Sequence, residues 1–163
     1  MILNNVELYW AKLSPSNHDM GFSGDKPQWN VQLRGNKAQS EEWKSLGLNP
    51  KVEEDSNGGV YYKIQVHKDA IKKDGQPNAP VPVVGADMFP LEDVGSVGNG
   101  SIANVKLRAF DWEFNGKTGR GVRLEAVQIV KLVVYASAAD DVMSGFEALD
   151  VPSQSDDGTA DLY

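Results

Sequence analysis

Residues 101–132, SIANVKLRAFDWEFNGKTGRGVRLEAVQIVKL, decide the fold. Successive side chains of a β-strand point to opposite faces, so the alternation in the first half of this stretch separates two surfaces. One surface is aliphatic and consists of Ala103, Val105, Leu107 and Ala109. The other is basic and aromatic and consists of Asn104, Lys106, Arg108, Phe110, Trp112 and Phe114. The dipeptide Asn115-Gly116 is typical of a hairpin turn, so the stretch predicts two strands joined by a glycine-rich loop over residues 115–121.

Working outward from this hairpin, the rest of the chain predicts further short strands and one firm helix. Alternating apolar residues predict strands at 6–13, 28–34 and 60–68, and residues 81–86 suggest a short edge strand. Residues 37–46 favour a helix that ends at Gly47. Four prolines between 70 and 100 rule out a central strand through much of that segment.

The sequence pattern also predicts which side chains share a face. Trp29, Val31 and Leu33 should face inward from one strand, and Val6, Leu8 and Trp10 should share a face of another. In the helix, Trp43 and Leu46 lie three residues apart and share one face. In residues 60–68, Tyr61 and Lys63 lie on a second basic and aromatic face.

The count is about five or six strands separated by turn signals. It favours a mainly β fold, a five-stranded oligonucleotide-binding (OB) barrel with elaborated loops and one or two short helices. We expect residues 1–139 to form this domain and residues 140–163 to form an acidic C-terminal tail. A short helix near 140–148 is compatible with the pattern, and residues 153–163 are expected to be disordered.

The charge of the chain is unevenly placed. The 163 residues sum to a net charge of −7, but residues 1–139 carry 16 acidic and 16 basic residues and are neutral. The seven acids of residues 140–163 are accompanied by no Lys or Arg. A neutral body with an acidic tail is compatible with a polyanionic ligand in a way that a uniformly acidic protein is not.

Several function classes find no support in the sequence. There are no cysteines and only two histidines, so disulfides and multi-histidine or thiolate metal sites are excluded. No phosphate-binding loop, nucleophile elbow or zinc-protease motif is present, so we expect neither an enzyme nor a cofactor or metal. We expect no signal peptide or membrane span, and the lack of cysteine fits a cytoplasmic location.

The basic and aromatic surfaces are the candidate binding site. Cations can hold phosphates, and exposed rings can stack on unpaired bases, which is what a single-stranded nucleic acid requires. The candidate residues for binding single-stranded DNA (ssDNA) are Arg34, Tyr61, Lys63, Lys106, Arg108, Phe110, Trp112, Phe114, Lys117, Arg120 and Arg123. The alternative is that Phe110, Trp112 and Phe114 belong to the core and that the charges form a solvated face.

The tail is the second candidate site. Its acids can imitate phosphates and cover a cationic groove, and its terminal Leu-Tyr pair can enter an apolar pocket on a partner. The candidate partner-binding residues are Asp156, Asp157, Asp161, Leu162 and Tyr163. The alternative is a tail that only confers solubility.

Together these stretches resemble a known family. The chain resembles bacteriophage single-stranded DNA-binding proteins with an OB fold. The resemblance is carried by residues 6–13 (VELYWAKL), 21–33 (GFSGDKPQWNVQL), 60–68 (VYYKIQVHK), 82–110 and 115–132, followed by an acidic tail that ends in an aromatic residue. The resemblance implies a sequence-tolerant protein that coats ssDNA in phage replication, recombination and repair, in the host cytoplasm. It also implies that the tail recruits replication proteins such as a polymerase, helicase or primase. A non-enzymatic structural or interaction domain of a phage particle is the alternative, and a homodimer stays open.

Overall fold

The computed structural model describes residues 1–15 and 26–134. These residues form seven strands, one α-helix and one short 3₁₀-helix. In chain order the elements are β1 (Ile2–Lys12), β2 (Gln28–Gly35), α1 (Lys37–Ser45), β3 (Lys51–Glu54), β4 (Val60–Asp69), β5 (Val83–Val84), η1 (Val94–Ser96), β6 (Ser101–Phe114) and β7 (Lys117–Lys131).

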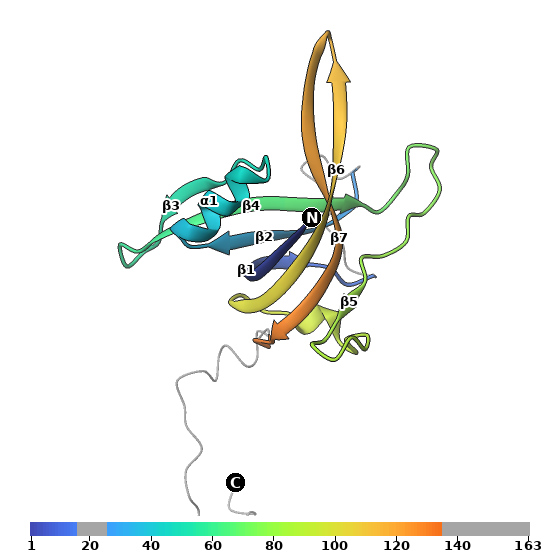
Figure 1. The fold of residues 1–163 in the computed structure, drawn as a ribbon. Coiled ribbons are helices and arrows are strands. Elements are labelled where there is room, and N and C mark those ends of the chain that lie inside the picture. Colours follow the sequence, from blue (N-terminus) through green and yellow to red (C-terminus); the bar gives the residue numbers. More distant parts are fainter. Residues whose placement is uncertain (16–25, 135–163) are drawn as a thin grey trace, which may run out of the picture.

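All seven strands belong to one sheet in the order β3-β4-β2-β1-β6-β7-β5 (Figure 1). Every neighbouring pair is antiparallel except β5 and β7, which are parallel. The sheet coils until β4 approaches β7, with Cα atoms within 8 Å, although no ladder joins these two strands in the described residues. The expected mainly β, OB-like fold is therefore confirmed, with more strands than expected and with a barrel that is not closed.

Strand β1 makes this coiling possible because it pairs with both β2 and β6. Its register shifts between Leu3 and Val6 and again between Tyr9 and Lys12. Asn5 and Trp10, which lie at these irregularities, both have a φ of +54°. Bulges of this kind bend a strand and increase its twist, so that one strand can serve two halves of a coiled sheet.

The core lies inside the coil and is built mainly from the alternating aliphatic residues. Trp29, Val31 and Leu33 are buried, as the alternation predicts. The prediction that Trp10 shares a face with Val6 and Leu8 is wrong, because its left-handed backbone turns it outward and leaves it 62 % exposed. Leu46, the residue that caps the helix end, is 37 % exposed. The buried apolar residues are Leu3, Val6, Leu8, Leu13, Trp29, Val31, Leu33, Trp43, Val66, Ala70, Val81, Val83, Val97, Ala103, Val105, Leu107, Leu124, Val127 and Ile129.

Helix α1 forms where the sequence predicts it. A capping box joins Asn36 and Gln39 at its start, and Gly47, with a φ of +90°, lies just beyond its end. Trp43 is 1 % exposed, and its ring passes so close to Gly35 that a Cβ there would come within 2.8 Å of it. Glycine at position 35 therefore lets the helix lie against β2.

Strands β6 and β7 continue beyond the sheet as a two-stranded hairpin that projects from the body (Figure 1). Asn115 and Gly116 have φ values of +52° and +76°, which fits a two-residue turn of the mirror-image type. Residues 117–121 therefore pair in β7 and do not extend the loop, contrary to the sequence prediction. Strand β3 was also missed, whereas the short edge strand appears as β5.

Some predictions fall outside the described residues. These are the helix near 140–148, the disorder of 153–163, and the five candidate tail residues from Asp156 to Tyr163. In the part of the chain that is described, no helix is long and apolar enough to cross a membrane.

Candidate nucleic-acid interface

The three aromatic residues of β6 form a row along one face of the projecting hairpin. Opposite residues of an antiparallel pair share a face, and Phe110, Trp112 and Phe114 lie opposite Gly121, Gly119 and Lys117 in that order. Trp112 is 44 % exposed and Phe114 is 71 % exposed, and Phe110 is half-buried. None of these rings is therefore fully buried.

The glycines of β7 determine how the rings lie. A Cβ at Gly119 would come within 2.2 Å of Trp112 Cζ2, and a Cβ at Gly121 would come within 2.6 Å of Phe110 Cζ. The rings consequently reach across the partner strand over bare backbone, a packing that shields the glycines from solvent. In Trp112 this arrangement fixes one side of the indole against the hairpin while much of the ring remains exposed.

The cations of the hairpin are divided between its two faces. Arg108 and Arg123 lie opposite each other on the aromatic face, and the guanidinium carbon of Arg123 is 4.6 Å from the centre of the Phe110 ring. Lys117 lies beside Phe114 at the hairpin end, and Lys106 is exposed on the same side of β6.

Arg120 differs from the other hairpin cations. It lies opposite Asp111 on the other face, and its Nε is 3.3 Å from the Asp111 carboxylate. The structure therefore does not bring Arg120 together with the aromatic row, and an acid already balances its charge.

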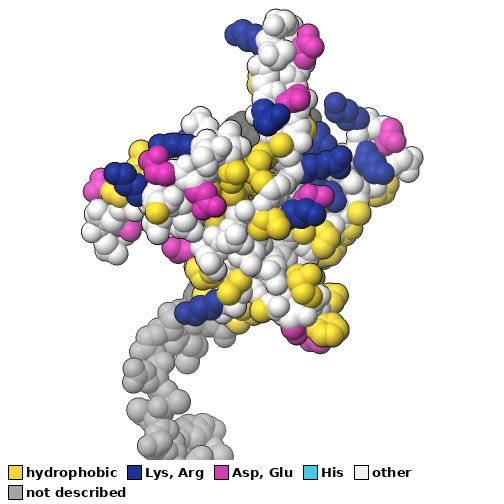
Figure 2. All heavy atoms as spheres, viewed as in Figure 1, with side chains coloured by type: hydrophobic (Ala, Val, Ile, Leu, Met, Phe, Trp, Pro, Cys, Tyr) yellow, Lys and Arg dark blue, Asp and Glu magenta, His cyan; other side chains and the backbone are white. Residues whose placement is uncertain are grey.

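A groove of about 970 Å³ runs between the hairpin and the segment that follows β4. Figure 2 shows Lys and Arg side chains gathered between these two parts of the molecule. The basic residues that line the groove are Lys68, Lys72, Lys73, Arg108 and Arg123, and the acidic ones are Asp69, Asp111, Glu113 and Glu125. Phe110 and Trp112 contribute the aromatic part of the wall.

Sequence reasoning missed one wall of this groove. Lys68 lies in β4, and Lys72 and Lys73 lie in the segment that follows β4. The prolines of that segment predicted only that it is mostly not a central strand. The adjacent pair Lys72-Lys73 was a visible signal. Nothing in a single sequence, however, places this pair across from a hairpin some 40 residues further on.

The remaining predicted residues are Arg34, Tyr61 and Lys63. Together with Tyr9, which was not predicted, they form a second cluster on the outer face of β1, β2 and β4, which we call the sheet platform (Tyr9, Arg34, Tyr61 and Lys63). The guanidinium carbon of Arg34 lies 3.6 Å from the centre of the Tyr9 ring and 4.1 Å from that of Tyr61. Arg34 Nε also donates to Gln32 Oε1 at 2.7 Å. The Arg34 guanidinium therefore lies between the rings of Tyr9 and Tyr61, and its cation–π contacts with both rings help to hold them in place.

An acid from β3 occupies the edge of the platform. Glu53 accepts a hydrogen bond from Lys63 Nζ at 2.5 Å and one from the Tyr61 hydroxyl at 2.7 Å. The bond from Lys63, followed by that from Tyr61, lowers the pKa of Glu53, and the bond to Glu53 raises the pKa of Tyr61. The Lys63 charge is thus balanced by a residue on a strand that the sequence did not predict.

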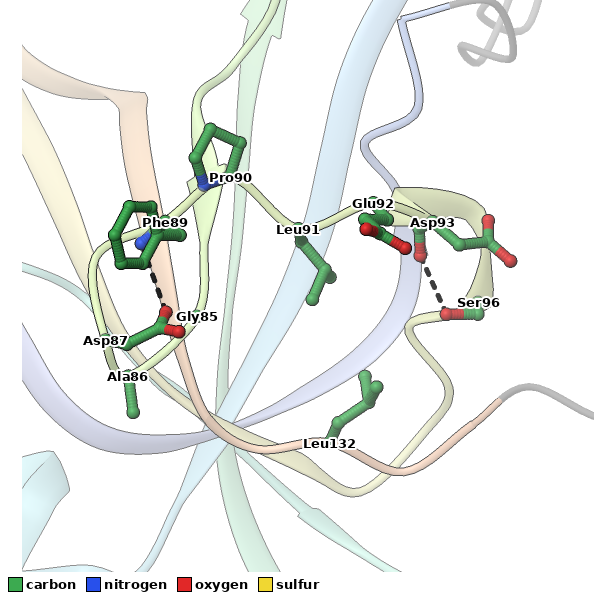
Figure 3. A pocket seen from close by; sticks show the side chains of 10 residues that line it. All are labelled: Gly85, Ala86, Asp87, Phe89, Pro90, Leu91, Glu92, Asp93, Ser96 and Leu132. Carbon is green, nitrogen blue, oxygen red and sulfur yellow. Dashed lines mark hydrogen bonds between the residues drawn. The ribbon is translucent and has the colours of Figure 1, made fainter.

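A second hollow, of about 520 Å³, has a different chemistry (Figure 3). Phe89, Pro90, Leu91 and Leu132 supply apolar side chains, and its charged lining residues are Asp87, Glu92 and Asp93. Its lining contains no Lys or Arg, so the hollow repels phosphate. Across residues 1–15 and 26–134, no group of three or more His, Cys, Asp or Glu side chains could hold a metal ion.

No protein-family model and no curated protein sequence matches the chain. Solved structures do match it. The single-stranded DNA-binding protein of bacteriophage Enc34, in complex with ssDNA, gives a TM-score of 0.58 at 12 % identity, over 80 % of this chain and 85 % of that one. A separate structure of the same phage protein gives a TM-score of 0.55 at 12 % identity, over 90 % of this chain and 89 % of that one. Its C-terminal truncation gives a TM-score of 0.56 at 13 % identity, over 80 % of this chain and 84 % of that one.

At these identities the likeness establishes the fold alone. The resemblance expected from the sequence is therefore confirmed at that level, and the chain has the fold of a phage single-stranded DNA-binding protein.

Proposed function

We propose that this protein is a sequence-tolerant single-stranded DNA-binding protein that acts in phage DNA replication, recombination and repair. The single observation that carries the proposal is the hairpin face on which Phe110, Trp112 and Phe114 form a row of partly exposed rings beside a groove lined by five basic and four acidic residues. Exposed rings of this size on a projecting hairpin contribute little to the stability of the fold, but they suit unpaired bases.

The proposed mechanism is binding without chemistry. Bases stack on the hairpin rings, and each stacked base contributes about 1–3 kcal/mol whatever its identity, because every base has a π-face. Arg108 and Arg123 from the hairpin and Lys68, Lys72 and Lys73 from the opposite wall hold the backbone phosphates. Because phosphates carry no sequence information, binding is tolerant of sequence.

A duplex fits this arrangement poorly. Its bases are already stacked on one another and are turned away from protein rings, so only the phosphate contacts remain. The fold shared with a phage protein that was solved in complex with ssDNA supports the same ligand. The proposal includes no enzymatic step.

Residues 1–139 are proposed to form the binding domain and residues 140–163 the tail, in the host cytoplasm. Seven acids and no Lys or Arg in the tail make it a competitor for the groove and a ligand for replication proteins. Asp156, Asp157 and Asp161 supply the charge, and Leu162 and Tyr163 supply the apolar end.

The test compares a fluorescent oligo-dT with a duplex of equal length over a salt series. We expect tighter binding to oligo-dT and an affinity that falls steeply with salt, because bound phosphates release counterions. Equal affinity for the two ligands, or no binding at low salt, would overturn the proposal.

A structural or interaction domain of a phage particle is the second candidate. It is favoured by Met88 and Phe89, which are 67 % and 70 % exposed, and Phe89 lines the second hollow. Tryptophan fluorescence separates the two functions, because ssDNA should quench Trp112 if it stacks there and should leave the emission of a structural domain unchanged.

A further inference from the structure

Trp10 is a large exposed ring that the binding site described so far does not use. The alternation of β1 places it on the buried face with Val6 and Leu8, yet it is 62 % exposed, whereas those two side chains are completely buried. The exposure follows from the bulge between Tyr9 and Lys12, which shifts the pairing of β1 with β2 by one step. A bulge redirects a side chain from one face of a strand to the other.

The outward position of Trp10 has an energetic cost and is held in place. Its φ of +54° is unfavourable for a bulky residue, and such a conformation persists only where the surroundings impose it. The imposing contact comes from the loop before β6, where Asn99 Oδ1 accepts a hydrogen bond from the Trp10 amide at 2.8 Å. A tertiary contact between residues 89 positions apart therefore fixes this ring outside the core.

The ring adjoins the sheet platform. It meets Tyr9 edge to face, with 6.3 Å between the ring centres and 62° between the planes. Tyr9 in turn packs on the Arg34 guanidinium, so that a ring, a second ring and a cation follow one another across β1 and β2. The charged groups around Tyr9 are Arg34 and Glu7, whose Oε2 lies 3.5 Å from the Tyr9 hydroxyl.

The residues around Trp10 indicate which kind of ligand this surface binds. An apolar protein segment would need aliphatic neighbours, but the ring that Trp10 meets is Tyr9, and Tyr9 packs on the Arg34 guanidinium. Among the described residues, Arg34 hydrogen-bonds only through Nε, which leaves its two terminal nitrogens available for a phosphate. A ring for a base and an arginine for the adjoining phosphate are the two contacts that a nucleotide of a single strand needs.

We propose that Trp10 is a base-stacking residue of a second ssDNA contact, centred on the sheet platform, and that Asn99 is its positioning residue. The ligand is an unpaired nucleobase of a strand whose phosphate lies at Arg34. The inference rests on the proposed function and extends it, because the bound strand then contacts the sheet as well as the hairpin.

The experiment measures oligo-dT affinity for Trp10→Ala, Trp10→Phe and Asn99→Ala, with Phe89→Ala as the matched control. Phe89 is a similarly exposed ring, but it lines the second hollow, whose charged lining residues are all acidic. We expect Trp10→Ala to lose about 5- to 150-fold in affinity, the range of one stacked base, and Trp10→Phe to keep most of the affinity. Asn99→Ala should lose less than Trp10→Ala, because the ring remains but is no longer held outward.

A fluorescence measurement needs no substitution at Trp10. In a Trp112→Phe background the other two tryptophans, Trp29 and Trp43, are 3 % and 1 % exposed, so the accessible emission comes from Trp10. We expect oligo-dT to quench it. Unquenched emission, wild-type affinity in Trp10→Ala, or an equal loss in Phe89→Ala would each overturn the inference while wild-type binding still supports the proposed function. No binding by the wild type would overturn both.

Discussion

The glycine at position 119 offers a direct test of the hairpin geometry. Gly119 has no positive φ, so its backbone accepts alanine without strain. The added Cβ, however, would lie 2.2 Å from Trp112 Cζ2, whereas ordinary contact begins at 3.4 Å. Because Trp112 is an exposed side chain and not backbone, the indole can lift off the hairpin to make room.

The magnitude of the effect follows from what the lifted ring loses. Alanine in a strand is more stable than glycine by roughly 0.5–1 kcal/mol, so Gly119→Ala should melt at the same temperature as the wild type or slightly higher. The ring itself remains, but it no longer presents a fixed face. The affinity for oligo-dT should therefore fall by about 1 kcal/mol, the lower end of the stacking range, which is about fivefold.

The assay is fluorescence anisotropy with labelled oligo-dT over a salt series. The slope of log affinity against log salt should not change, because no phosphate contact is removed. Gly95→Ala is the control: Gly95 lies in η1, outside the hairpin, and its Cβ would meet Asp93 at an ordinary 3.5 Å. The reasoning fails if Gly119→Ala binds like the wild type while Trp112→Ala loses affinity, or if Gly119→Ala melts at a clearly lower temperature.

Three further predictions concern the platform, the core and the tail. Glu53→Gln frees Lys63 from its carboxylate, so we expect tighter oligo-dT binding and a salt slope steeper by about one; an unchanged slope would contradict this. The pKa of Glu53 is lowered in the folded protein, so its bond with Lys63 is complete above the ordinary carboxyl pKa and is lost as the pH falls through the lowered pKa. As the pH falls through that lowered pKa at constant salt, the affinity for oligo-dT should rise in the wild type but not in Glu53→Gln. Trp43→Ala removes a ring that is 1 % exposed and packs on Gly35, and urea unfolding should register a loss of about 3–5 kcal/mol, with a loss below 1 kcal/mol speaking against its core position. Deleting residues 156–163 should tighten ssDNA binding at low salt and matter less at high salt; weaker or unchanged binding would argue against competition by the tail.

Local patterns were sufficient for much of the fold. The alternation in residues 28–34 and 103–107 depends only on the two-residue period of a strand, and it predicted the buried side chains there correctly. The Asn115-Gly116 dipeptide and the helix from Lys37 are likewise encoded within a few residues. For the binding site, the sequence identified the basic and aromatic face of β6, and its three rings are at least partly exposed.

The features that the sequence did not predict depend on distant parts of the chain. Strand β3 is four residues long and exposed throughout, so it has no alternation to detect, and it exists because β4 pairs with it. Without β3, Glu53 could not be placed beside Lys63. The lysines after β4 face the hairpin only because the sheet coils and brings β4 towards β7.

Trp10 shows most clearly the difference between what the sequence determines and what depends on the tertiary structure. By itself, the sequence predicted a strand over residues 6–13 with aromatic residues at 9 and 10. Which way Trp10 points was decided by a bulge and by the side chain of Asn99, a contact that forms only once the loop before β6 is folded against β1. A period of two specifies faces only while the strand is regular, and a single long-range hydrogen bond at a bulge is enough to reverse them.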